Sequence, residues 1–320
     1  MVDIRIFTEP QQGATYDEQL AIAKATEVAG LDGFFRSDHY LPIGPMGGST
    51  RAASGIGPTD AWITLAGLAR ETSRIRLGTL LTAGTFRHPG VLAIAAAQVD
   101  AMSGGRVEFG LGAGWYEQEH LAHGIPFPPS AAERLARLAE QFEVITGMWT
   151  TPVGSSFSYS GKYFQLSDGP ALPKPVQQPT PPLIVGGRGL NKTPALAARF
   201  AAEWNVPFQT VDAMREIVTA AEVACEAVGR DPATLCSSVA LATVIGNSAA
   251  DIERRVSATN QDPERLKAAG LYGSPAEIAA RLAEYAALGI SRIYLQLLDI
   301  TDLEQVGLIG SELAPLISEL

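Results

Sequence analysis

The stretch RIRLGTLLTAGTFRHPGVLA, residues 74–93, changes its hydrophobic pattern part-way along. Residues 74–82 are rich in Ile, Leu and Thr, as is typical of a strand. His88–Pro89 then opens a segment whose apolar residues predict a helix over residues 89–102. A strand that leads directly into a helix is the unit of a parallel sheet, because parallel strands need a crossover connection.

The same strand-then-helix unit recurs along the chain. Strands are predicted at 3–8, 33–37, 74–82, 106–113, 182–187, 203–207, 236–246 and 292–298. Helices are predicted at 17–29, 58–72, 89–102, 131–149, 191–202, 211–228 and 274–288. The pattern predicts one α/β domain over residues 1–320, a closed (β/α)8 TIM barrel. An open doubly wound sheet is less favoured, because no GxGxxG turn follows the first strand.

Three stretches are too long and too rich in Gly and Pro to be simple connectors. They cover about 40–57, 151–181 and 257–273, and the second contains a predicted hairpin, SFSYS–GKYFQL. Loops that follow strands lie on the catalytic face of a barrel. We therefore expect insertion loops at the carboxyl ends of the strands, with 40–57 covering the active site; a tolerated insertion is the alternative.

Composition narrows the class of protein. The chain has 34 acidic and 24 basic residues, a net charge of −10, which argues against nucleic acid or an anionic membrane as the main partner. The N-terminal residues lack the apolar region of a signal peptide, and no apolar run approaches the length of a membrane span. Cys225 and Cys236 show no CxxC spacing, so neither a disulfide framework nor a zinc site is predicted. We expect a cytoplasmic protein.

The run FFRSDHYLP, residues 34–42, places three polar side chains where the second strand ends. Ser37, Asp38 and His39 would therefore face the catalytic end of a barrel. Histidine exchanges protons near neutral pH, and a neighbouring carboxylate can hold its tautomer. The alternative is structural, with Asp38 capping a turn and His39 packing against the loop.

Glycines mark the carboxyl ends of two further predicted strands, 106–113 and 182–187. In FGLGAGWYEQEH, residues 109–120, alternate glycines leave one strand edge without side chains, so a flat ring or a phosphate could approach the backbone. In LIVGGRGLNKT, residues 183–193, glycines precede a helix whose free amides would bind an anion, assisted by Arg188 and Lys192. A tight turn is the alternative reading of the second run.

The same region contains the side-chain types of a metal site. His120 and His123 lie near Glu117 and Glu119. Their spacing is not a known ligand pattern, so no metal is predicted.

Four segments of the chain resemble one known family. They are SDHYLP (37–42), RIRLGTLLTAGTFRHPGVLA (74–93), MSGGRVEFGLGAGWYEQEHLAHGIPFPP (102–129) and PPLIVGGRGLNKTPALAARFAAEWN (181–205). With them the chain resembles the luciferase-like monooxygenase superfamily, and within it the branch that uses coenzyme F420, a 5-deazaflavin. The resemblance implies an F420-dependent oxidoreductase that moves a hydride to or from a small organic substrate. Relatives that use flavin mononucleotide (FMN) share much of the pattern, so an FMN-dependent monooxygenase consuming O2 is the alternative.

The resemblance also implies roles for individual residues. His39, with Asp38, would carry the proton chemistry beside the ring. A bulge in the third strand would support the ring on a non-prolyl cis peptide, by position Thr79–Leu80. The cofactor-binding residues implied are Ser37, Asp38, Thr79, Leu80, Gly112, Ala113, Gly114, Gly186, Gly187 and Arg188.

Two positions depart from the family's sugar-phosphate dehydrogenase. Trp115 stands where that enzyme carries a glutamate, and Ile43 stands where it carries a tryptophan. A glucose-6-phosphate substrate is therefore not expected, and Tyr40 and Trp115 predict a more apolar substrate pocket. Relatives are frequently homodimers, which makes a homodimer one expected assembly. A cofactor-binding protein without turnover is a further alternative, against which the polar run at 37–39 argues.

Overall fold

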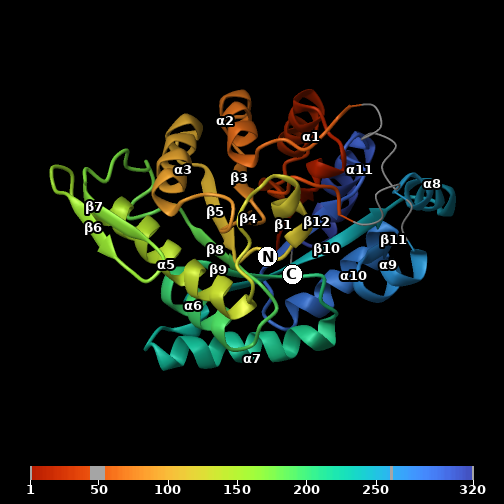
Figure 1. The fold of residues 1–320 in the computed structure, drawn as a ribbon. Helices are drawn as coiled ribbons and strands as arrows, with labels where there is room; N and C mark the ends of the chain where they lie inside the picture. Colours follow the sequence, from red (N-terminus) through yellow and green to blue (C-terminus); the bar gives the residue numbers. More distant parts are fainter. Residues whose placement is uncertain (1, 44–54, 260–261, 319–320) are drawn as a thin grey trace.

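The computed structural model describes residues 2–43, 55–259 and 262–318, and its centre is a closed barrel of parallel strands (Figure 1). The wall consists of β1 (Asp3–Thr8), β2 (Gly33–Arg36), β3 (Arg76–Thr79) continued by β4 (Thr82–Ala83), β5 (Val107–Gly112), β8 (Leu183–Gly186), β9 (Glu203–Pro207), β10 (Cys236–Ile245) and β12 (Arg292–Leu297). Pairing of β9 with β10 and of β12 with β1 closes the ring. The predicted TIM barrel is confirmed.

The expected helices surround this wall (Figure 1). They are α1 (Tyr16–Val28), α2 (Ala61–Glu71), α3 (Pro89–Ser103), α5 (Ala131–Thr150), α6 (Lys192–Phe200), α7 (Val211–Ala227) and α10 (Pro275–Ala286). Shorter helices that the periodicity did not predict are α4 (Glu117–Ala122), α8 (Ala249–Thr259), α9 (Pro263–Ala269), α11 (Leu303–Leu308) and α12 (Ala314–Leu316). Local sequence signals fix where several of these helices begin. At the N-terminus of α1, for example, Thr15 and Glu18 form a reciprocal capping box.

The three expected insertions have different outcomes. Most of 40–57 lies outside the described residues. The segment 151–181 contains the predicted hairpin, formed by β6 (Phe157–Ser160) and β7 (Gln165–Gly169), which packs beside α5. The third stretch is largely ordered structure: it holds α9 and the strand β11 (Leu271–Gly273), which extends the sheet beside β10. A strand of three residues is too short for an alternation signal, so the sequence did not predict it.

The barrel interior is layered. Its amino-terminal end holds a charge network of three arginines and three carboxylates, contributed by β1, β3, β5, β9 and β12: Asp3, Arg5, Arg76, Glu108, Glu203 and Arg292. Above it lies an apolar layer formed by Phe7, Phe35, Leu80, Ile184, Ala240 and Tyr294. Charges at the amino end of a barrel act on stability, whereas residues at the carboxyl ends of the strands form active sites.

Candidate active site

The polar run after β2 lies at the carboxyl end of the barrel, as predicted. Ser37 and Asp38 are almost fully buried, and the side chain of His39 is 14% exposed. The Ser37 hydroxyl donates to Gln11 Oε1 at 2.6 Å, which ties the end of β2 to the loop after β1. All three side chains therefore lie on the face where barrel enzymes carry out their chemistry.

The interruption of the third strand is present, but one residue later than expected. A non-prolyl cis peptide joins Leu80 to Leu81, not Thr79 to Leu80. The reason lies in strand pairing, because the Leu80 amide still donates to Arg36 O at 2.8 Å and so continues the register with β2. Thr79 remains inside β3, and its hydroxyl donates to Gly110 O at 2.9 Å.

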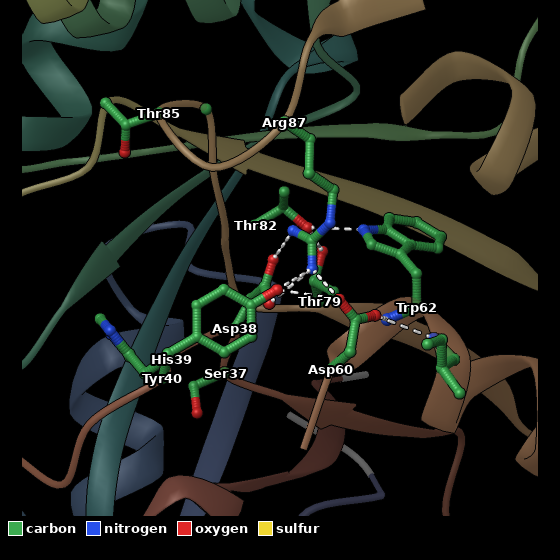
Figure 2. Close-up of polar contacts among 12 residues, drawn as sticks. Ser37, Asp38, His39, Tyr40, Asp60, Trp62, Thr79, Thr82, Thr85 and Arg87 are labelled. Atoms are coloured by element: carbon green, nitrogen blue, oxygen red, sulfur yellow. Dashed lines mark hydrogen bonds and ion pairs between the residues drawn. The ribbon is translucent and has the colours of Figure 1, made fainter. Parts of the chain in front are cut away.

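Hydrogen bonds from three side chains fix this interrupted strand (Figure 2). Trp62 Nε1 donates to Thr82 Oγ1 at 3.0 Å, and Thr82 Oγ1 donates to Thr79 Oγ1 at 3.0 Å. The Thr79 hydroxyl is buried and engaged on both sides. Any contact of Thr79 with a cofactor would therefore involve its backbone.

The glycines of β5 and β8 are required for a reason that differs from the expected one. A Cβ at Gly110 would lie 2.0 Å from Thr79 O, and one at Gly186 would lie 1.8 Å from a methyl carbon of Leu81. At Gly114, which has φ of +76°, a Cβ would lie 2.5 Å from Thr85 Oγ1. The space beside these glycines is thus occupied by the chain's own residues 79–85, which could not pack there otherwise.

Asp38 belongs to an ion-pair cluster centred on Arg87 (Figure 2). Arg87 contacts Asp38 Oδ2 and Asp60 Oδ2, each at 2.5 Å, and donates to the Tyr40 hydroxyl at 2.7 Å. Tyr40 in turn donates to Asp60 Oδ2 at 2.8 Å. Burial, together with the negative charges of Asp38 and Asp60, raises the pKa of Tyr40. The cluster joins the loop after β2 to the N-cap of α2.

His39 pairs with a different carboxylate. Its Nδ1 lies 3.0 and 3.1 Å from the two oxygens of Glu119, and Glu119 Oε2 also accepts the Tyr40 amide at 2.9 Å. The imidazole ring contacts Trp115 and Tyr116 edge-on. Burial alone would lower the pKa of His39, but Glu119, Glu9 and Asp38 together raise it. Its Nε2 makes no hydrogen bond to any residue that the structure describes.

His120 on α4 and His123 at its C-cap anchor that helix. His120 is buried, with Nδ1 2.8 Å from Tyr116 O and Nε2 2.7 Å from Thr85 Oγ1. His123 Nδ1 lies 2.8 Å from Glu119 O. Within residues 2–43, 55–259 and 262–318, no group of three or more His, Cys, Asp or Glu side chains is placed to hold a metal ion. Glu119 is the one carboxylate on the buried part of α4, and it faces His39.

A cavity of about 490 Å³ opens beside the ends of β4 and β5. Its lining combines Gly84 and Ala113 with apolar rings and three guanidinium groups, those of Arg87, Arg134 and Arg137. Gln141 donates to Gly84 O, and its buried Oε1 finds no partner among the described residues. Tyr40 and Trp115 do not line this cavity; Trp115 is 60% exposed and stacks on Tyr116. Their role in substrate binding stays a prediction.

The predicted phosphate loop precedes α6. Gly187 has φ of +141°, and its carbonyl accepts from Trp204 Nε1 at 3.0 Å. Arg188 donates to Pro207 O at 3.2 Å, and the N-cap Asn191 makes no capping hydrogen bond. Amides at the start of α6 are thus left without a capping side chain, as an anion site requires.

The sequence model of the luciferase-like monooxygenase family matches residues 1–262. The chain belongs to this family. Family membership confirms the resemblance seen in the sequence and the prediction of an oxidoreductase.

Individual luciferase-like proteins show how far the likeness extends. The F420-dependent hydroxymycolic acid dehydrogenase of Mycobacterium tuberculosis is 31% identical over 240 residues, 73% of this chain and 61% of its own. The oxygenase component of the flavin-dependent trigonelline monooxygenase of Acinetobacter baylyi is 27% identical over 192 residues, 58% of this chain and 47% of its own. The structure of an F420-dependent secondary alcohol dehydrogenase superimposes with a TM-score of 0.82 at 18% identity, covering 99% of each chain. The helices in the described part of this chain all lack the length and apolar character of a membrane span.

Three residues of the site were missed by sequence reasoning, namely Arg87, Asp60 and Glu119. Arg87 stands directly before the His88–Pro89 helix start, and Asp60 precedes α2 as its N-cap. Those signals predict helix ends and give no hint of a joint ion pair. Glu119 was considered only as a metal ligand, because its partner lies 80 positions away in the chain.

Proposed function

We propose that the chain is an F420-dependent oxidoreductase that moves a hydride between the deazaflavin and a small, partly apolar organic substrate. The observation that carries the proposal is His39, which sits at the carboxyl end of the barrel, paired through Nδ1 and unpartnered at Nε2 among the described residues. The 31% identity to an F420-dependent dehydrogenase supports the choice of cofactor. The cofactor supplies the hydride when bound; the chain supplies the proton group.

The residues at the barrel end have separate roles in this proposal. His39 exchanges the proton, since its Nε2 is available. Asp38, held by its ion pair with Arg87, positions the loop that carries His39. Backbone groups at Leu80, Leu81 and Gly112–Gly114 would contact the ring.

The cofactor's anionic arm has two candidate places. The cavity beside β4 and β5 offers Arg134 and Arg137, each with donors beyond those used on Gly114 O, Pro128 O and Glu133. The loop Gly186–Arg188 offers backbone amides at α6. F420 and FMN both carry a phosphate, so guanidinium groups that line a cavity could bind either cofactor.

Replacing Arg134 by Ala is expected to weaken FMN or F420 binding by about 10- to 100-fold. That range corresponds to loss of one charge-assisted hydrogen bond, about 1.5–3 kcal/mol. Riboflavin, which lacks the phosphate, is the matched ligand: its dissociation constant should change little in the same variant. Equal losses for FMN and riboflavin would show that Arg134 acts through loop structure, and a loss confined to Arg188→Ala would place the phosphate at α6.

The alternative function is an FMN-dependent monooxygenase that uses reduced flavin and O2. The 27% identity to a flavin-dependent monooxygenase component supports it, and a phosphate-binding cavity serves both functions equally.

Titration of the purified protein with F420 and with FMN tests the proposal. Tight F420 binding with weak FMN binding, and no oxygen consumption during turnover, is the expected result. Tight binding of FMN alone, with oxygen consumed in step with substrate, would replace the proposed function by the monooxygenase.

A further inference from the structure

Glu119 is the least expected member of the site. It is 1% exposed, on a six-residue helix, yet its carboxylate makes no ion pair with an arginine or lysine of the described chain. Its contacts are His39 Nδ1 and the Tyr40 amide. A buried carboxylate is costly unless a partner compensates it, and the partner that can carry a positive charge here is His39.

The groups that face His39 are predominantly negative. Glu119 approaches from α4, Glu9 from the end of β1, and Asp38 from the preceding position on the loop after β2. Arg87 pairs with Asp38 and Asp60, and among the described residues the imidazole ring also contacts Trp115 and Tyr116. This environment favours the charged imidazole despite its burial.

The helix that carries Glu119 is fixed independently of His39. His120, the next residue, is held by Tyr116 O and by Thr85 Oγ1, and its ring packs against Phe86 and Phe127. Thr85 follows β4 directly, so α4 is tied to the barrel end itself. The position of the carboxylate is therefore set before any ligand binds.

We propose that Glu119 is a positioning residue that holds His39 as an imidazolium, with Nδ1–H on the carboxylate and Nε2–H directed to substrate, so that the site reduces a polarised double bond such as a carbonyl. This rests on the proposed hydride-transfer function. The reduced deazaflavin, when bound, would supply the hydride and be left oxidised; the hydride brings two electrons and would form the new C–H bond. The π pair of the carbonyl would take the Nε2 proton to give an alcohol, and His39, left neutral, would regain a proton from the solvent, so that each turnover consumes one proton.

The proposal is tested first on the protein without cofactor, by following histidine ring signals with pH in NMR spectra. The chain has four histidines, so a His39→Gln spectrum identifies the His39 signals. We expect Nδ1–H in the neutral form, and a titration midpoint above 6.5 that falls by about one pH unit or more in Glu119→Gln. Gln can still accept the Tyr40 amide, which favours a folded variant.

Glu117→Gln is the matched control, because it removes the same charge from an exposed position on the same helix. Its His39 titration should match the wild type, and Glu119→Asp should restore most of the shift. An unchanged midpoint in Glu119→Gln, or an equal fall in Glu117→Gln, overturns the role of Glu119. If Glu119→Gln does not fold, a His39 midpoint at or below 6.5 in the wild type overturns the role of Glu119.

Turnover distinguishes this inference from the choice of cofactor. The rate of carbonyl reduction should not change with pH up to the titration midpoint of His39, and it should fall above that midpoint. In Glu119→Gln the rate should begin to fall at lower pH, with the KM for the substrate nearly unchanged. If the titration midpoint of His39 falls in Glu119→Gln but the protein binds no F420, the proposed function is wrong, whereas the role of Glu119 in holding the charge of His39 is supported. A pH profile that Glu119→Gln does not move would sink the reductive role.

Discussion

Replacing His39 by Ala is expected to lower the rate of the chemical step by about 10²- to 10⁴-fold, the range typical of a lost general acid or base. The reason is geometric: Nδ1 contacts Glu119, whereas Nε2 has no hydrogen-bond partner among the residues that the structure describes. Cofactor affinity should change little, because His39 is not among the residues that line the cavity. Single-turnover kinetics with pre-bound cofactor separate the two quantities.

Chemical rescue is the control for this variant. Added imidazole should restore part of the rate of His39→Ala and leave the wild type unaffected. Turnover within a few-fold of the wild type in His39→Ala would contradict the role of His39, and a lost ability to bind cofactor would show that the histidine acts through the structure of the site.

The second large effect is expected at the opposite end of the barrel. Glu108 is 3% exposed, contacts Arg5, and lies 2.9 Å from Arg76 and 3.6 Å from Arg292. Glu108→Gln leaves these arginines with less compensation inside the barrel, so we expect the free energy of unfolding to fall by about 3–5 kcal/mol. Urea denaturation with linear extrapolation measures the change.

The matched control for Glu108→Gln is Glu71→Gln. Glu71 pairs with Lys24 at 3.2 Å, but both side chains are about half exposed. Such a surface pair contributes about 0–1 kcal/mol. Equal losses in the two variants would contradict the importance of the network, as would a loss in Glu108→Gln no larger than that expected at the surface.

The pH dependence of stability follows from the same carboxylate. Burial alone would raise the pKa of Glu108, but Arg5, Arg292 and Arg76 lower it. A lowered pKa means that the unfolded chain takes up the proton first as pH falls. The stabilisation is therefore full above about pH 5 and is lost progressively below about pH 4. Glu108→Gln should flatten this part of the stability curve.

The fold could be predicted because each strand–helix unit carries its own periodicity. The interrupted third strand was also visible, but the place of its cis peptide was not. That place depends on the hydrogen bond from Leu80 to Arg36 on the neighbouring strand, which local sequence does not specify.

Only part of the candidate site could be predicted from the sequence, for the same reason. His39 and Asp38 stand at a strand end, where the barrel rule identifies them. Their partners Glu119 and Arg87 lie 80 and 49 positions further along the chain. Which carboxylate meets the histidine is decided by how α4 packs on the barrel. A helix of six residues is too short to show a clear periodicity, so the sequence alone predicts neither α4 nor its packing on the barrel.

The two charge clusters lie at opposite ends of one barrel, with the apolar layer around Phe35 and Tyr294 between them. As pH falls below the ordinary range of a carboxyl group, protonation of Glu108 weakens the amino-end network and loosens the fold. In the proposed reaction, rising pH instead removes the proton that His39 would supply. The working range of the enzyme would then have an acid limit set by unfolding and an alkaline limit set by chemistry. Because no residue belongs to both clusters, either limit could be moved by mutation without shifting the other.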